Sequence, residues 1–66
     1  MLYHAIEEAT IWKAIPGKSI GVLSIGTVCV VLEKDAVETI GYKFHRVFRG
    51  DTIGLVYAEY LRALKD

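Results

Sequence analysis

The chain lacks most features that mark the common functional classes. It has a single cysteine, Cys29, so no disulfide forms within it. Eight basic residues balance eight acidic ones, and a neutral chain is not favoured as a partner for bulk duplex nucleic acid. No apolar run approaches the roughly 18 residues of a membrane span, and no positive segment of a secretory signal precedes one. With the unpaired cysteine, these absences predict a cytoplasmic protein that does not enter a membrane.

Motifs for catalysis and for cofactors are absent as well. The soft metal ligands His4, Cys29 and His45 lie far apart, without the paired spacing of structural zinc sites. The glycines form neither a Walker pattern nor a G-x-G-x-x-G loop. Acid-base catalysis would need two carboxylates in a pocket, and a small barrel has little concave volume for one. We therefore expect a non-enzymatic protein without cofactor or metal.

What the chain does have is apolar residues in excess of what so small a core can hide. Its 66 residues form one domain over 1–66, and a chain of this length buries only about 60% of its surface on folding. Yet 53% of the residues are hydrophobic. Part of this apolar surface is expected to stay outside, where it indicates a protein partner or a second copy of the chain.

Turn signals recur about every ten residues, which is typical of a small all-β barrel. They fall at 16–17, 24–26, 34–36, 41, 49–51 and 54. Between them we expect a barrel of five to six antiparallel strands, with strands at 19–23, 27–33, 42–48 and 52–56 and a loosely alternating segment over 2–13. Only 58–65 has a helix-forming composition, and a single turn before a final strand suits it equally well.

The facing of two strands affects the site. In 27–33, alternation favours Val28, Val30 and Leu32 inside and Cys29 and Val31 outside. In 42–48, it favours an inward row that begins with Tyr42 and alternates along the strand, and a β-bulge would exchange the two rows.

Three segments together resemble the bacterial SH3 (SH3b) domains. Residues 20–33, IGVLSIGTVCVVLE, are similar to that family's IGxLxxGTxVxVLE stretch; residues 11–17 and 54–61 occupy the places of its NVRSGPG and GWVxxxYL segments. The resemblance implies an SH3-like barrel with a 3-10 turn before the last strand. It also implies a binding surface between the loop after the first strand, the loop at 35–41 and that turn. The family's closing Trp is Leu55 here, and its arginine after the first strand is Lys13. These two departures weaken the prediction that the chain binds a cell-wall peptide.

Two groups of residues are candidates for binding a protein or peptide. Aromatic anchors give much contact area at low entropic cost, and those near the implied groove are Trp12, Tyr42, Tyr57 and Tyr60. Core packing is the competing interpretation for Trp12 and Tyr57. A second group consists of apolar residues expected on outward faces, among them Val31 and Leu55, which would form a docking or self-association surface or a small secondary cluster.

We therefore predict a non-enzymatic protein-interaction module, a small accessory or inhibitor-type protein of the kind that a phage or mobile element encodes, which docks on a protein or self-associates. The alternative, implied by the resemblance, is a module that binds peptidoglycan in the cell wall. A third interpretation is single-stranded nucleic-acid binding, because basic and aromatic residues interleave along one strand; its basic residues are Lys43, Arg46 and Arg49.

Overall fold

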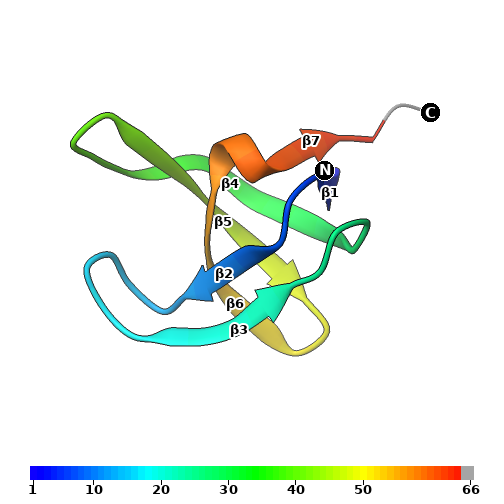
Figure 1. The fold of residues 1–66 in the computed structure, drawn as a ribbon, viewed down its shortest axis with the longest axis horizontal. Helices are drawn as coiled ribbons and strands as arrows, with labels where there is room; N and C mark the ends of the chain where they lie inside the picture. The colour runs from blue at the N-terminus through cyan, green and yellow to red at the C-terminus, as the bar shows by residue number, and fades with distance from the viewer. Residues whose placement is uncertain (65–66) are drawn as a thin grey trace.

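A single antiparallel sheet accounts for nearly all of the regular structure. The computed structural model describes residues 1–64 (Figure 1). Its strands are β1 (Leu2–Ala5), β2 (Ala9–Trp12), β3 (Ser19–Leu23), β4 (Val28–Thr39), β5 (Tyr42–Arg49), β6 (Thr52–Tyr57) and β7 (Leu61–Ala63), and the 3-10 turn η1 (Ala58–Tyr60) precedes β7. The predicted all-β class and the 3-10 turn before the last strand are confirmed. In the described residues the strands number seven rather than five or six.

The sheet curls into an open half-barrel. Its strand order is β3-β2-β6-β5-β4-β1-β7, so β3 and β7 form the two edges, and Figure 1 shows the sheet bending round between them. Hairpins on both sides of β5 fix its register: Thr39 pairs with Tyr42 across one two-residue turn, and Arg49 pairs with Thr52 across the other. The predicted turns at 41 and 49–51 are therefore confirmed, and tight hairpin turns of this kind need residues with positive φ.

Strand β4 continues through 34–36, where the sequence predicted a turn. Its register against β5 shifts between Val31 and Glu33 and again between Glu33 and Val37. Within this irregular stretch Asp35 has a φ of 50°, and its backbone N–H donates a hydrogen bond to Nδ1 of His45 at 2.9 Å. A β-bulge takes up extra residues as a local kink without ending the strand, which is why the predicted turn is wrong.

The inner face of the curled sheet carries the core. Ten buried side chains form it, two each from β1, β2 and β4 and one each from β3, β5, β6 and β7: Tyr3, Ala5, Ala9, Ile11, Leu23, Cys29, Val31, Val47, Val56 and Leu61. The strands approach closely at Gly54, where an added Cβ would lie 2.5 Å from Cγ2 of Ile11 and 2.8 Å from the carbonyl oxygen of Trp12. Only glycine leaves room for this close approach of β2 and β6.

The expected facing of β4 is wrong. Cys29 and Val31 are 2% and 7% exposed and face the core, whereas Val28 and Leu32 are 42% and 52% exposed. Because this segment is apolar on both faces, alternation identifies no solvent side. Pairing with core residues decides instead: Cys29 lies opposite Tyr3, and Val31 lies opposite Val47.

The favoured facing of β5 is wrong for the same reason, and the exchanged rows hold. His45 and Val47 are buried, while Tyr42 and Phe48 are exposed on the other face. Strand β5 therefore presents an outer row of aromatic residues and one arginine. Among the described residues, no helix is long and apolar enough to cross a membrane.

Candidate functional site

Four aromatic side chains gather on the outer face at one end of β5. Tyr42 and Phe44 share that face because they lie two residues apart, and the register places Tyr57 of β6 opposite Phe44. The turn η1 then brings Tyr60 against Tyr57. The ring centroid of Tyr57 lies 5.6 Å from Tyr42, 5.8 Å from Phe44 and 4.9 Å from Tyr60. We call Tyr42, Phe44, Tyr57 and Tyr60 the aromatic cluster.

The central ring of the aromatic cluster is half-buried, and the rings of Tyr42 and Tyr60 are exposed to solvent. Tyr57 is half-buried at its centre and contacts Tyr42 and Tyr60 edge to face, an arrangement that aromatic rings favour. Tyr42 and Tyr60 are 54% and 38% exposed. Desolvation, followed by the charge of Glu59, raises the pKa of Tyr57 above its ordinary value, so its hydroxyl stays neutral near pH 7. The cluster therefore offers apolar ring surface together with the neutral hydroxyl group of Tyr57.

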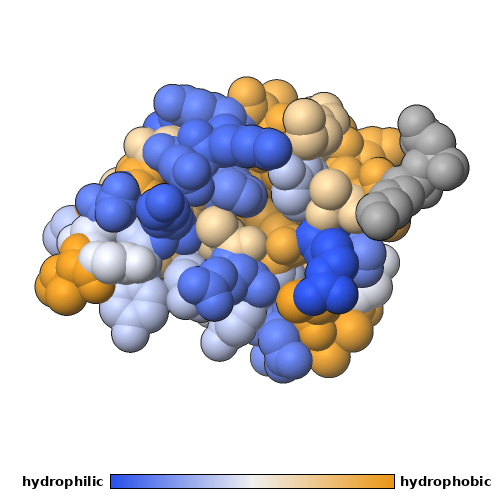
Figure 2. All heavy atoms as spheres, turned by 90° about the horizontal axis from the view of Figure 1, so that it is seen from above, coloured by the Kyte–Doolittle hydropathy of each residue, from blue (hydrophilic) through white to orange (hydrophobic). Residues whose placement is uncertain are grey.

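The turn beside the aromatic cluster exposes an isoleucine in a strained conformation. Ile40 is 93% exposed and has a φ of 49°, followed by Gly41 at 81°. A β-branched residue in this left-handed region is strained, and hairpin turns with two positive φ values prefer Asn-Gly. Figure 2 shows an apolar spot at the end of the molecule where β4 and β5 join. Neither core packing nor turn chemistry accounts for isoleucine here.

The other predicted binding residues have different surroundings. Leu55 does lie on the outer face, opposite Trp12 on one side and Arg46 on the other, but with large neighbours on both sides it is only 3% exposed. Trp12 itself is half-buried. Val31 lies in the core. The expectation that Val31 and Leu55 form an accessible surface is therefore wrong, and Trp12 borders Leu55 rather than joining the aromatic cluster.

The three basic residues of the nucleic-acid hypothesis do not share one surface. Lys43 and Arg49 lie at opposite ends of β5. Arg46 lies on the face of the strand opposite to theirs, where it forms an ion pair with Glu33. Single-strand binding needs cations and stacking rings along one track. The structure brings together the aromatic rings but not these cations.

The soft metal ligands and the thiol are placed separately. Cys29 is buried in the core, and burial raises the pKa of its thiol, with a smaller opposing effect from Arg49. His45 is also buried and contacts the ring of Tyr3 edge to face, with 5.8 Å between ring centroids. Within residues 1–64, no group of three His, Cys, Asp or Glu residues is arranged to hold a metal ion. In the described part of the chain, Cys29 and His45 are buried side chains that pack inside the fold.

Sequence reasoning missed two members of this surface. Phe44 was expected inside with the rest of its row, and Ile40 was not considered. The signal for Ile40 was present in the sequence, because Gly41 marks a hairpin turn and a preceding isoleucine departs from the usual turn residues.

Comparison with protein-family models, with curated proteins and with solved structures gives no match to this chain. The SH3-like resemblance therefore stays a prediction, and the function has to be argued from the surface itself.

Proposed function

We propose that this chain is a non-enzymatic protein-interaction module, accessory or inhibitory in role, that docks on a partner protein through the aromatic cluster and Ile40. The observation that supports it is the packing of four aromatic rings against one another outside the core, with Tyr42 and Tyr60 left open. Rigid tyrosine rings contribute large contact area at little entropic cost, and they dominate binding energy at protein interfaces.

Ile40 adds the apolar anchor of the proposed interface. A side chain exposed at the end of a hairpin fits an apolar pocket on a partner. The strained backbone at Ile40 does not stabilise the free chain. Backbone strain of this kind concentrates at functional positions. The partner we infer presents an apolar pocket next to a surface with hydrogen-bond acceptors for the tyrosine hydroxyls.

The test compares tagged proteins in parallel pull-downs from host lysate, with mass spectrometry of what they retain. We expect one stoichiometric protein to be captured by the wild type and lost, by about tenfold or more, in Tyr42→Ser and Ile40→Asn. Because asparagine adopts positive φ more readily, Ile40→Asn should also raise the free energy of unfolding by about 1 kcal/mol. Loss of capture in a more stable variant cannot be attributed to unfolding.

Ile25→Ser is the matched control, because Ile25 is an exposed apolar residue in the turn after β3 and belongs to neither the aromatic cluster nor any other proposed contact surface. Capture that survives Tyr42→Ser and Ile40→Asn would reject the aromatic cluster as the docking site. A parallel arm with purified sacculi tests the wall-binding alternative: retention on sacculi that Tyr60→Ala weakens would replace our proposal with it.

A specific observation also favours self-association as a second mode. Register pairs Leu2 with Val30, Val30 with Phe48, and Phe48 with Ile53, so four apolar residues form one row across β1, β4, β5 and β6. Leu2, Phe48 and Ile53 are 51%, 37% and 54% exposed. We call these four residues the apolar row. A row of exposed apolar side chains of this kind suits a symmetric contact with a second copy.

A further inference from the structure

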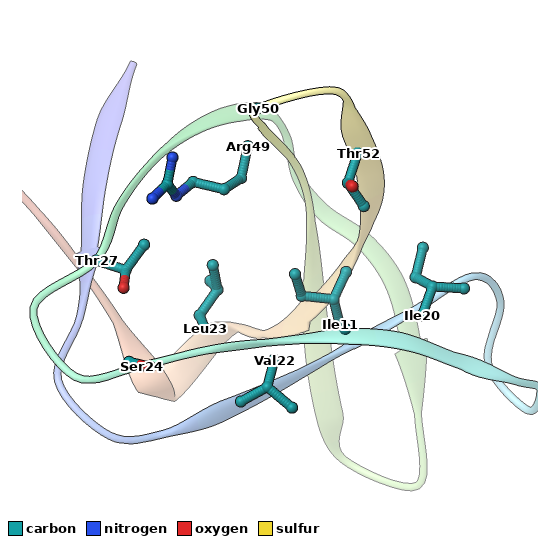
Figure 3. A pocket seen from close by; sticks show the side chains of 10 residues that line it. Ile11, Ile20, Val22, Leu23, Ser24, Thr27, Arg49, Gly50 and Thr52 are labelled. Carbon is teal, nitrogen blue, oxygen red and sulfur yellow. The ribbon is translucent and has the colours of Figure 1, made fainter.

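A groove of about 420 Å³ lies at the open side of the half-barrel, between β3 and the hairpin of β5 and β6 (Figure 3). Ile11 and Leu23 are buried beneath it, and the exposed apolar side chain of Ile20 on β3 also lines it. It lies at the Arg49 end of β5, whereas the aromatic cluster lies at the Tyr42 end. Seven residue steps of strand separate these ends, roughly 24 Å.

The groove has one strong cation. In Figure 3 the guanidinium of Arg49 points into the groove on the side of Thr27. In residues 1–64, Arg46 forms a side-chain ion pair with Glu33, and Nδ1 of His45 lies 3.7 Å from a carboxylate oxygen of Asp35. Neither contact involves Arg49, which has no carboxylate partner in this part of the chain. Ser24 and Thr27, which carry hydroxyl groups, also line the groove, whereas the hydroxyl of Thr52 donates a hydrogen bond to Asp51. A free guanidinium with nearby hydroxyls is suited to a carboxylate, which it can hold through two parallel hydrogen bonds.

The strand that borders the groove has a free edge. β3 pairs only with β2, and it stands at the end of the strand order. Its sequence, SIGVL, contains neither charge nor proline, the residues that usually protect an edge from pairing with another chain. Gly21, in the middle of β3, lines the groove and leaves the backbone accessible there. An extended peptide can therefore add to β3 through main-chain hydrogen bonds.

We propose that this groove binds the C-terminal end of an extended peptide. The terminal carboxylate is held by Arg49 and the neighbouring hydroxyls, the last side chain is apolar and packs over Ile11 and Leu23, and the preceding residues pair with β3. The charge of Arg49, the apolar floor and the free strand edge each select one part of such a ligand. This site is separate from the aromatic cluster, and the proposal holds whether or not the cluster binds a partner.

The experiment is an NMR titration of the ¹⁵N-labelled protein with four N-acetyl tetrapeptides that end in Val, Ile, Leu or Phe. Each peptide is used as the free acid and as the C-terminal amide. We expect at least one free acid to shift the amide signals of Gly21, Val22, Thr27 and Gly50 and to bind about tenfold more tightly than its amide. Arg49→Gln should reduce the affinity for the acid to that for the amide, and Arg49→Lys should retain part of it.

Lys43→Gln is the matched control, since it removes an exposed cation from the same strand at the far end, and it should leave binding unchanged. The proposal is overturned if acid and amide bind equally, if no free acid shifts these signals at about 2 mM, or if the shifts lie at Tyr42 and Tyr60 instead. It is also overturned if inorganic phosphate binds as tightly as the best acid, which would identify a general anion site.

Discussion

At the scale of single residues, His45 joins the core to the irregular part of β4. It is 8% exposed, and its Nδ1 accepts the backbone N–H of Asp35, which requires the neutral ring. Burial lowers the pKa of His45 below its ordinary value of 6.5; the charge of Asp35 opposes this and that of Lys34 adds to it. The unfolded chain therefore binds the proton more readily than the folded one.

This difference fixes the sign of the pH dependence. The contribution of His45 to stability is complete above its unfolded pKa and is lost as the pH falls from about 6.5 toward the lower folded value. We expect the urea midpoint of unfolding to fall between about pH 7.5 and pH 5.5. His45→Gln keeps a side-chain acceptor for Asp35 but does not titrate, so its midpoint should change less over this range. An equal decline in both proteins would contradict the assignment.

At the scale of strands, the close approach of β2 and β6 depends on the absence of a side chain at Gly54. An added Cβ at Gly54 would meet Ile11 and a backbone carbonyl at under 3.0 Å, whereas one at Gly21 would meet only Cδ1 of Ile11 at 3.6 Å, an ordinary contact. Backbone cannot yield as a flexible side chain can. We expect Gly54→Ala to lower the free energy of unfolding by about 2 kcal/mol and Gly21→Ala to change it by less than about 0.5 kcal/mol, both measured by urea denaturation. Equal effects would show that β2 and β6 do not constrain each other here.

At the scale of strands, part of the fold could be predicted from the sequence and part could not. The turns at Gly41 and Gly50 and the strands between them follow from local chemistry, because few residues adopt the backbone of a tight hairpin. The bulge in β4 could not be predicted, since it depends on Asp35 meeting His45 ten residues away. The facing of Cys29 and Val31 was also out of reach, because an apolar strand has no polar row to mark the outside.

The candidate site was predictable to the same extent. Tyr42, Tyr57 and Tyr60 were named as binding residues, and the structure brings them together. Leu55 was placed on the correct face, but its burial depends on the neighbours that register sets beside it, Trp12 and Arg46. Pattern alone therefore found the residue types of the surface, and strand register determined which of them are accessible.

At the scale of the whole molecule, the curled sheet has one face in the core and the other on the surface. The inner face holds the ten core residues. The outer face carries the aromatic cluster at one end of β5 and the apolar row at the other. A chain with so much apolar surface on one side of a single sheet is suited to associating with another protein surface.

Self-association through the apolar row can be measured directly by light scattering. We expect a mass above that of the monomer for the wild type, shifted to the monomer by Phe48→Lys or Ile53→Lys, because a symmetric contact sets each new charge near its own copy. Ile25→Lys is the control, since Ile25 is 68% exposed in the turn after β3 and lies outside the row. Lysine at Val31 or Leu55 would instead place a charge in a buried site and destabilise the fold. A monomeric wild type, or a mass that Phe48→Lys and Ile53→Lys leave unchanged, would show that the apolar row does not join two copies.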